Sequence, residues 1–372
     1  MYKNLFLESI KNLKFFKQAH ENSKKIVFYS EGKKYDHFYT PFIKSCIKNN
    51  LSFTYLSSDN EKPFQNNNEK YKFYFIGKSF VRTYLFTFLD CKNLITTTPD
   101  IGNSFLKKSI NCKNMIFFHH SMCGLTTTLK NGALSHYDTI LCSNKKHFEE
   151  LLNYNFINKN KKLIKFGYPK IDEILNNSNI KSNNKKIKNI LIAPSWGNEK
   201  EDYELYKRII LNLIDKEIYV KFRPHPMTIL YFKKYLKKLK NYFKKYNNFE
   251  ISEVDNNVKD YMNSDFIISD WSGSAMEFSL ATEKPCLFLN TKRKLINKSS
   301  SEEQKKNSFE YFFRKYLDCE ISISEIENLY FIINRIHSNN SFYEKLKYFK
   351  SEYLYNLGKT DTEIDKFMLS IF

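Results

Sequence analysis

Three short motifs carry most of the side chains that could bind or activate a phosphorylated substrate. The first, residues 223–226, reads Arg-Pro-His-Pro and follows the apolar run 219–222. Two prolines cannot continue a central strand, so they turn the chain and place Arg223 and His225 at its carboxyl end. Arginine offers a planar fork to phosphate oxygens, and a histidine beside it can donate to the same group. Taken alone, the motif is better explained as a strand-end turn with an incidental histidine than as a phosphate site. Its context, however, favours phosphate binding.

The second motif, residues 269–277, lies between an apolar run and an apolar helix. Small hydroxyl residues and a glycine at a helix N-terminus expose backbone N–H groups and the positive end of the helix dipole, which suits a diphosphate. Glu277, one turn later, can accept a hydrogen bond from a ribose hydroxyl. Ordinary helix capping by Asp270 or Ser272 explains the same pattern and is compatible with phosphate binding. The candidate donor-binding residues here are Ser272, Gly273, Ser274 and Glu277.

The third motif is a pair of histidines, His119 and His120, at the end of the apolar run 115–118. A histidine in this position can act as general base on a hydroxyl, because its unperturbed pKa of about 6.5 lies near working pH. Adjacent side chains point in different directions, so only one of the two serves. We favour His120 as the base, and we expect His119 to be held by hydrogen bonds at the strand end.

Weaker signals come from other strand-end loops. Glu31 and Gly32 follow the first apolar run, and Ser195 follows the first apolar run of the second half. Each could contact acceptor or donor, or simply turn the chain. Residues 358–360 (Gly-Lys-Thr) imitate the end of a phosphate-binding P-loop, but Tyr353 occupies the position of the required earlier glycine. We discard that match.

These side chains need strands and helices in alternation to position them. Short apolar runs alternate with helical patterns throughout the first half, at residues 25–29, 53–56, 71–76, 94–97, 115–118 and 139–142. The alternation restarts after a polar stretch at 176–188, with runs at 189–193, 219–222, 266–269 and 286–289. Such alternation predicts parallel α/β sheets.

The pattern therefore predicts an α/β fold of two Rossmann-like domains facing a cleft, with ligands at the carboxyl ends of the strands. At 372 residues the chain also exceeds the size at which one core stops growing. We expect an N-terminal domain (1–178), a C-terminal domain (186–340) and closing helices (341–372) that pack back across the domains. Residues 229–246 form a basic amphipathic helix, for which packing on the sheet is favoured over lying on a membrane.

Composition limits the class of partner and the compartment. The formal charge of +20 favours anionic partners, namely nucleotides, phosphopolymers, acidic lipid or nucleic acid, although a solvated basic surface explains it equally well. Seven scattered cysteines without a C-x-x-C pair argue for a reducing compartment, without a disulfide framework or zinc site. The N-terminus reads as an amphipathic helix, and no run approaches 18 apolar residues, so we expect a cytoplasmic or peripheral membrane protein.

Five ordered motifs resemble those of the CDP-glycerol glycerophosphotransferase family, the teichoic-acid and capsule polymerases of the cell envelope. The matching segments are residues 118–121, 167–172, 193–196, 223–226 and 269–274. The resemblance spans the chain from Tyr29 to about Thr360. Five motifs in order are far more specific than any single one.

The resemblance implies a GT-B fold that binds the acceptor on its N-terminal domain and the CDP donor on its C-terminal one. The family's proposed base corresponds to His120, the histidine of its Arg-Pro-His-Pro motif to His225, and its donor-phosphate turn to residues 272–274. The chain departs from the family at His119 and Ser121, where Trp and Gly are usual, and at Gly273 and Glu277, where many members carry Ser and Asp. These departures preserve the class and leave the exact donor open.

The hypothesis that follows is transfer of a polyol-phosphate unit from a CDP-activated donor to a polymer or lipid-linked acceptor, with release of CMP. Since no D-x-D motif stands at a strand end, we expect the helix dipole and basic residues to replace a metal, and no cofactor. A nucleotide-sugar glycosyltransferase for capsule or surface polysaccharide is the alternative enzyme. An anionic membrane surface remains a candidate partner, whereas nucleic acid is disfavoured because no recognisable motif for it is present.

Overall fold

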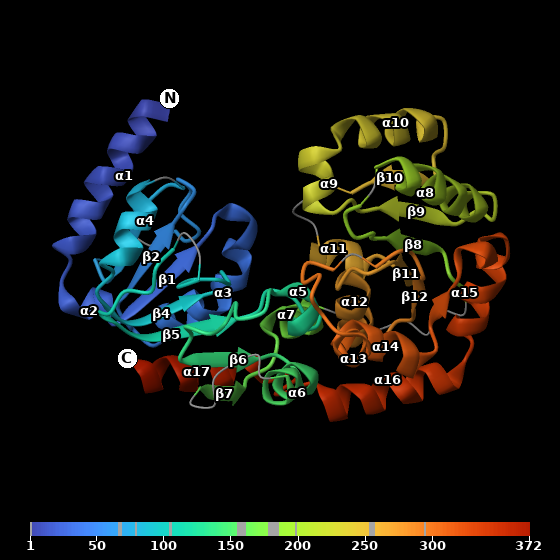
Figure 1. The fold of residues 1–372 in the computed structure, drawn as a ribbon. Coiled ribbons are helices and arrows are strands. Elements are labelled where there is room, and N and C mark those ends of the chain that lie inside the picture. Colours follow the sequence, from blue (N-terminus) through green and yellow to red (C-terminus); the bar gives the residue numbers. More distant parts are fainter. Residues whose placement is uncertain are drawn as a thin grey trace. The chain divides into compact units, whose positions relative to one another are not determined.

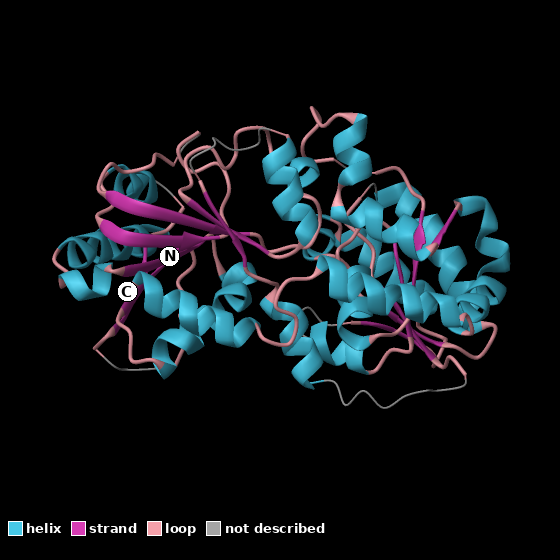
Figure 2. Cartoon of the chain, turned by 90° about the horizontal axis from the view of Figure 1, so that it is seen from below, coloured by secondary structure: helices cyan, strands magenta, loops and turns pink. Residues whose placement is uncertain are grey.

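The computed structural model describes residues 2–65, 69–78, 80–103, 106–154, 161–177, 186–197, 199–252, 257–293 and 295–372. Its contacts divide the chain into two compact units (Figure 1). Unit 1 comprises Met1–Pro169, Ile296–Lys305 and Leu354–Phe372, and unit 2 comprises Lys170–Leu295 and Lys306–Tyr353. In both units the strands lie side by side with helices outside them (Figure 2).

Unit 1 is built on a seven-stranded parallel sheet with the order β3-β2-β1-β4-β5-β6-β7. The strands read as near-continuous apolar runs, as expected when both faces of a parallel sheet are covered. Their bounds are β1 Ile26–Ser30, β2 Phe53–Ser57, β3 Tyr71–Phe75, β4 Cys91–Thr96, β5 Cys112–Phe118, β6 Thr139–Cys142 and β7 Lys162–Lys165.

Helices cover both faces of this sheet. One apolar cluster joins the sheet to α4, through Leu85 and Phe86, and to Phe16 of α1; the other joins it to α3 and α17. The helices of the unit are α1 Tyr2–Lys17, α2 Glu21–Lys24, α3 Lys33–Lys48, α4 Phe80–Thr87, α5 Leu125–Thr128, α6 Lys145–Asn153 and α17 Thr360–Ile371.

Unit 2 has a six-stranded parallel sheet with the order β10-β9-β8-β11-β12-β13, the order of the Rossmann fold. Its strands are β8 Asn189–Ile192, β9 Tyr219–Phe222, β10 Phe249–Ile251, β11 Phe266–Ser269, β12 Cys286–Leu289 and β13 Glu320–Ile321. The remaining helices are α7 Pro169–Asn177, α8 Glu199–Ile214, α9 Pro226–Tyr231, α10 Lys233–Phe243, α11 Asn257–Met262, α12 Ser274–Thr282, α13 Glu302–Asn307, α14 Phe309–Leu317, α15 Leu329–His337 and α16 Asn340–Tyr353, with a 3₁₀-helix at Ile323–Asn328.

Two late segments of the chain belong to unit 1. Helix α17 packs on α3, where Asp365 accepts hydrogen bonds from Ser45 Oγ at 2.6 Å and Asn49 Nδ2 at 3.0 Å. The approach to α17 requires Gly167, whose φ is +104° and whose Cβ, if present, would lie 2.6 Å from the Tyr355 carbonyl oxygen. In the segment Ile296–Lys305, Ser300 Oγ donates to the Thr126 carbonyl at 2.7 Å.

The structure confirms the predicted α/β class with two Rossmann-like parallel sheets, and each apolar run named above contains a strand. Residues 229–246 form two helices, α9 and α10, divided at Phe232, and Leu239 and Phe243 of α10 are buried in unit 2. The basic helix therefore packs its apolar face on the protein. The proposed linker at 176–188 falls mostly on 178–185, outside the described residues.

Candidate functional site

In unit 2 the strand order reverses between β8 and β11, and the residues that follow these two strands meet at the carboxyl edge of the sheet. Ser195 follows β8 and Asp270 follows β11. The Asp270 carboxylate accepts from the Ser195 backbone N–H at 2.6 Å and from its hydroxyl at 2.7 Å. Ligands of Rossmann-like sheets bind at such a reversal. Asp270, which the sequence suggested only as a helix cap, thus fixes the loop at this edge.

Arg223 follows β9 at the same edge and is buried. Its Nη2 donates to the Tyr261 hydroxyl at 2.9 Å, and its guanidinium lies 4.4 Å from the centre of the Tyr261 ring. Burial raises the pKa of Tyr261, and the positive charge of Arg223 opposes that rise. Stacking and hydrogen bonding together fix the plane of the guanidinium, which is the property needed to present its fork to an anion.

His225 begins helix α9 as its N-terminal cap. Its Nδ1 accepts from the Met227 backbone N–H at 3.1 Å, and Pro226 occupies the first helical position. Because Nδ1 is the acceptor, a neutral His225 ring carries its proton on Nε2. The local geometry therefore prepares Nε2 as a hydrogen-bond donor.

Ser272, Gly273 and Ser274 form the turn between β11 and α12. Ser272 Oγ lies 3.1 Å from Ser274 Oγ and accepts from the Ser274 backbone N–H at 3.3 Å. Gly273 is the N-cap residue of α12, and no side-chain hydrogen bond caps this helix. The first turn of α12 thus presents backbone N–H groups at the switch point of the sheet, an arrangement suited to phosphate.

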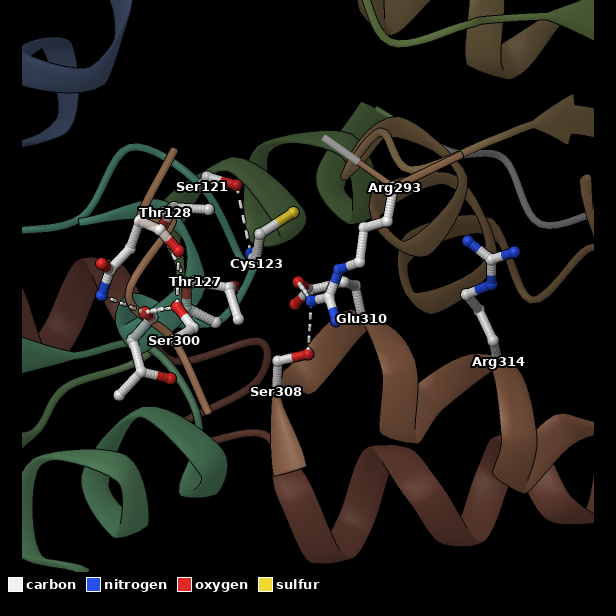
Figure 3. A network of polar contacts seen from close by, with 12 residues as sticks. Ser121, Cys123, Thr127, Thr128, Arg293, Ser300, Ser308, Glu310 and Arg314 are labelled. Atoms are coloured by element: carbon white, nitrogen blue, oxygen red, sulfur yellow. Dashed lines mark hydrogen bonds and ion pairs between the residues drawn. The ribbon is translucent and has the colours of Figure 1, made fainter. Parts of the chain in front are cut away.

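Trp271, just before this turn, is held by arginines. Its Nε1 donates to the Thr291 carbonyl at 2.8 Å, and the Arg314 guanidinium lies 3.7 Å from its ring centre. Arg314 is fully buried and donates to the Asp270 carbonyl at 3.0 Å and to Glu320 at 2.7 Å. The Arg293 guanidinium lies 4.8 Å from the centre of the Trp271 ring and pairs with Glu310. Figure 3 shows Arg293 beside Glu310 and Ser308. The turn at residues 272–274 therefore follows a tryptophan that is packed against buried charged side chains, a support that the sequence motif did not reveal.

Glu277 is buried one turn into α12. Its Oε2 pairs with Lys170 Nζ at 2.6 Å and accepts from the Tyr261 hydroxyl at 3.2 Å. Burial is the largest single influence on the pKa of Lys170 and lowers it, but the charge and hydrogen bond of Glu277 together with the Tyr261 hydroxyl outweigh burial, so the net pKa is raised and Lys170 stays protonated. The predicted ribose contact of Glu277 stays a prediction; the observed role of its carboxylate is to link α7, α11 and α12.

In unit 1, His120 follows β5, and its Nδ1 lies 2.8 Å from the hydroxyl of Thr97, which follows the neighbouring strand β4. The ring packs edge-on against Tyr35 of α3 at 5.1 Å, and the Tyr168 hydroxyl donates to the His120 carbonyl at 3.1 Å. When Nδ1–H donates to Thr97, Nε2 has its lone pair available to accept a proton. The contact with Thr97 therefore orients the His120 ring and is compatible with the tautomer that a general base requires, a contact that the sequence did not suggest.

His119 lies in a different environment from its neighbour. It is buried, its Nε2 is 3.2 Å from Thr128 Oγ1, and its ring stacks with that of His147 at 5.6 Å. Burial, followed by the nearby rings of His120 and His147, holds the pKa of His119 well below its usual range. The sequence analysis expected hydrogen bonds at the strand end to hold His119; the structure gives its Nε2 a contact with the Thr128 hydroxyl and leaves its buried Nδ1 without a hydrogen-bond partner. The loop that holds it, with Ser121, Cys123, Thr127 and Thr128, is shown in Figure 3.

Glu31 and Gly32 follow β1, which neighbours β4 at the reversal of strand order in unit 1. Gly32 has a φ of +137°, and a Cβ on it would lie 2.0 Å from Asp59 Oδ2. That carboxylate accepts from the Lys33 backbone N–H at 2.9 Å and so caps α3. Glycine is therefore required for the cap, and the partly exposed Glu31 is left at the carboxyl edge near His120's strand.

The structure thus groups the candidates by unit. Those at the carboxyl edge of the unit 2 sheet are Ser195, Arg223, His225, Ser272, Gly273, Ser274 and, buried beneath them, Glu277; those at the corresponding edge of unit 1 are Glu31, Gly32 and His120. In the described part of the chain, no three His, Cys, Asp or Glu side chains gather as a metal site. The helices described there are each too short or too polar to span a membrane.

Solved structures with similar folds include transferases and epimerases. A variant of the wall teichoic acid polymerase TagF has 15% identity and a TM-score of 0.58, with 99% of this chain and 97% of that chain covered. UDP-GlcNAc 2-epimerase from Methanocaldococcus jannaschii, solved with UDP-GlcNAc and UDP, has 14% identity and a TM-score of 0.59, with 93% and 99% covered. A glycosyltransferase from Rickettsia africae has 11% identity and a TM-score of 0.55, with 93% and 97% covered. These likenesses identify the fold as the GT-B type.

Sequence comparison identifies the family. No curated protein sequence matches the chain significantly. Residues 13–298 match the family model described as CDP-glycerol:poly(glycerophosphate) glycerophosphotransferase, which covers most of the chain and both units. The resemblance seen in the five motifs is thereby confirmed. The chain belongs to the CDP-glycerol:poly(glycerophosphate) glycerophosphotransferase family and is a transferase of this type.

Proposed function

We propose that this transferase moves a glycerol-phosphate or related polyol-phosphate unit from a CDP-activated donor to a hydroxyl of a cell-envelope polymer or lipid-linked acceptor. The observation that carries the proposal is the gathering of the family's motif residues at one edge of the unit 2 sheet. Ser195, Arg223 and the turn at 272–274 all follow strands that end there. A teichoic-acid or capsule polymer is the acceptor class that the family implies.

In this mechanism the donor diphosphate binds at the N-terminus of α12. The backbone N–H groups of the turn, the Arg223 guanidinium and His225 Nε2–H stabilise the charge that grows on the leaving phosphate. Such transfer depends chiefly on positioning and electrostatics, since the phosphoryl group needs little covalent assistance.

On the acceptor side, His120 Nε2 takes the proton of the attacking hydroxyl. The hydroxyl oxygen forms a bond to the β-phosphorus of the donor while the bond from that phosphorus to the bridging oxygen breaks. The electron pair of the broken bond leaves with CMP, and the proton remains on His120. The Nδ1 contact with Thr97, at 2.8 Å, steadies the resulting imidazolium.

The experiment that tests the donor class is thermal stabilisation by CDP, CMP, UDP and GDP, because a ligand that binds the folded state raises its stability. We expect selective stabilisation by the cytidine nucleotides, reduced in His225→Ala. Preference for UDP or GDP would replace this proposal with nucleotide-sugar transfer. Stabilisation by RNA and by no nucleotide would replace it with a nucleic-acid-binding function.

We further propose that the protein acts in the cytoplasm at the inner face of the bacterial membrane and docks through an α1–α4 surface, defined as Phe6, Leu7, Phe15, Phe80 and Phe88 with Lys11, Lys14 and Lys17. These apolar side chains are all exposed, Phe80 to 73%. Lys17 Nζ lies 4.8 Å from the Tyr84 ring and 5.9 Å from the Phe88 ring, beside a pocket of about 290 Å³. Exposed aromatics among lysines suit an anionic lipid interface.

Sedimentation with phosphatidylglycerol vesicles tests this docking. We expect the wild type to pellet with these vesicles and not with phosphatidylcholine vesicles, and Phe80→Ser/Phe88→Ser to remain in the supernatant. The matched control is Leu230→Ser/Tyr231→Ser on α9, where both side chains are also exposed. Equal loss of binding in the control would reject the α1–α4 surface as the docking site.

A further inference from the structure

Helix α10 carries a dense group of lysines whose charge the proposed reaction does not use. The segment 226–249, which includes α9 and α10, contains no acidic residue. The seven lysines of residues 233–245 are all exposed, and none of them forms an ion pair with another described residue. They are Lys233, Lys234, Lys237, Lys238, Lys240, Lys244 and Lys245. The helix therefore presents a strong positive charge to solvent.

The rotation of α10 on unit 2 is fixed by its packing. Leu239 and Phe243 are buried, and the Phe243 ring lies 4.7 Å from that of Phe249 in β10. On the side next to α8, Lys238 Nζ lies 3.9 Å from the centre of the Tyr203 ring. Figure 1 shows α10 beside α8 and α9. The side of α10 that points away from these contacts is the exposed one.

Four of the lysines form a line along this exposed side, which we call the α10 lysine stripe. They succeed one another at intervals of four, three and four residues, and they are Lys233, Lys237, Lys240 and Lys244. At 3.6 residues per turn they lie within an arc of roughly 60° and extend over roughly 16 Å of the helix axis. Lys244, which follows the last residue of α10, keeps helical backbone angles, so the line includes it. A single line of cations suits a thread-like polyanion.

The spacing of the stripe matches that of a phosphodiester polymer. A repeat built on a three-carbon polyol has six backbone bonds, which span roughly 7 Å when extended, at about 1.2 Å for each bond. Neighbouring lysines of the stripe are roughly 4.5–6 Å apart along the helix axis, and their long flexible side chains can adjust to the longer repeat. The stripe can therefore pair with successive phosphates of one chain. Such pairing gains affinity from the release of counterions and needs no further contacts.

A lipid surface and a nucleic acid fit the stripe less well than a phosphodiester polymer does. Docking on a lipid surface gains from apolar side chains that insert beside the lysines, whereas Leu239 and Phe243 of α10 are buried in the protein. Single-stranded nucleic acid gains from aromatic rings on which its bases stack. The exposed aromatic ring of α10, Tyr242, lies 4.2 Å from Lys207 Nζ on the side of α8. The stripe thus offers charge alone.

We propose that the α10 lysine stripe is a second binding site, separate from the donor site, that holds the phosphodiester chain of the polymer along its length. The inference rests on the proposed function, because it takes the polymer to be built of polyol phosphates. A polymer held on the stripe stays at the enzyme between transfers, so the effective concentration of its end is raised. The site therefore favours repeated addition of units to one chain.

The test measures the binding of a fluorescein-labelled oligo(glycerol phosphate), long enough to cover the stripe, by fluorescence anisotropy without any donor. The stripe variant changes its four lysines to glutamine. We expect its Kd to rise roughly 100-fold at about 0.1 M salt, and the slope of log Kd against log salt concentration to fall by about 2–3, at about 0.7 for each phosphate released. The charge-matched control changes four exposed lysines scattered over both units, and should bind as the wild type does; these are Lys44, Lys113, Lys216 and Lys347.

Three further measurements sharpen this test. Arginine at all four stripe positions should keep the wild-type Kd, and sn-glycerol 3-phosphate, which has a single phosphate, should not displace the oligomer. An unchanged Kd in the stripe variant, or an equal loss in the scattered control, would overturn the site. Binding of oligouridylate at least about tenfold tighter than that of the oligomer, or loss of phosphatidylglycerol vesicle binding in the stripe variant, would also overturn it in favour of nucleic acid or lipid. Stabilisation by CDP should be the same in the stripe variant and the wild type; its failure in both would overturn the donor proposal, whatever the oligomer does.

Discussion

The carboxylate of Asp270 accepts two hydrogen bonds from Ser195, one from its backbone N–H at 2.6 Å and one from its hydroxyl at 2.7 Å. This pair joins the loops after β8 and β11, where the sheet of unit 2 reverses its strand order. It therefore fixes the spacing of the two loops between which a donor diphosphate is proposed to bind.

Asp270→Asn should weaken donor binding and stability together, because an amide cannot accept both bonds with the same strength. We expect a loss of about 1–3 kcal/mol in the free energy of unfolding and a higher KM for the CDP donor. Ser195→Ala removes only the hydroxyl bond and should lose about 1 kcal/mol. Urea unfolding measures the stability of each variant, and initial rates measure its KM for the CDP donor. A larger loss of unfolding free energy in Ser195→Ala than in Asp270→Asn would contradict this prediction.

The buried pair of Lys170 and Glu277 should be a structural element of unit 2. Glu277→Gln leaves the Lys170 charge without its partner and should lower the free energy of unfolding by about 3–5 kcal/mol. Adding Lys170→Met to it should recover more than about 1 kcal/mol, because the two residues are coupled.

An exposed ion pair provides the control for that cycle. Lys366→Gln, which breaks a pair with Glu363 on the surface of α17, should change stability by less than about 1 kcal/mol. Denaturant unfolding compares these three variants with the wild type. If Glu277→Gln keeps full stability and loses nucleotide binding, Glu277 contacts the ribose as its motif predicted.

Thr97 should be a positioning residue for His120. Thr97→Val preserves the shape of the buried side chain and removes the hydroxyl that lies 2.8 Å from Nδ1. We expect kcat to fall roughly tenfold with the acceptor KM little changed, since the ring loses the contact that orients it. Thr128→Val, which instead affects the contact with His119, should keep kcat. Wild-type kcat in Thr97→Val would remove Thr97 from the mechanism.

The buried His119 should make the protein sensitive to acid. Its pKa is lowered in the folded state, so below about pH 6.5 the unfolded chain binds a proton that the folded chain does not. Its contribution to stability is therefore complete above that pH and decreases as the pH falls, by up to about 1.4 kcal/mol per pH unit. His119→Gln should have a shallower pH dependence of unfolding between pH 6.5 and 5.

His20→Gln, at an exposed histidine, is the control for this pH series. It should follow the wild-type curve. Parallel curves for wild type and His119→Gln would mean that His119 is charged in the folded protein.

Much of this fold could be predicted from the sequence, because buried parallel strands leave continuous apolar runs that turn residues interrupt. The strands that escaped notice have weaker patterns. Strand β7 (Lys162–Lys165) has only two apolar residues, Leu163 and Ile164, between two lysines, and β10 (Phe249–Ile251) and β13 (Glu320–Ile321) are very short. All three are edge strands, which pair with only one neighbouring strand and need less apolar character.

The site was only partly predictable, for a related reason. Residues at strand ends, such as Arg223 and His120, carry a local signal in their motifs. The residues that orient them, Tyr261 and Thr97, lie far from them in sequence and are of types common in any core. Lys170 is the intermediate case, because it belongs to the motif 167–172, but its pairing with Glu277 depends on the packing of α7 on α12. Such partners become visible only when the chain is folded.

The division of unit 1 into three chain segments has a consequence for biosynthesis. Its N-terminal segment supplies the whole seven-stranded sheet, whose last strand ends at Lys165. Helix α17, which covers α3, begins only at Thr360, 195 residues later in the chain. A ribosome adds about 5–20 residues each second, so the sheet waits many seconds with the apolar surface around Phe42 and Phe166 uncovered. During that interval the uncovered apolar surface is open to aggregation, and unit 2, although it begins later, has all its strands before unit 1 is finished.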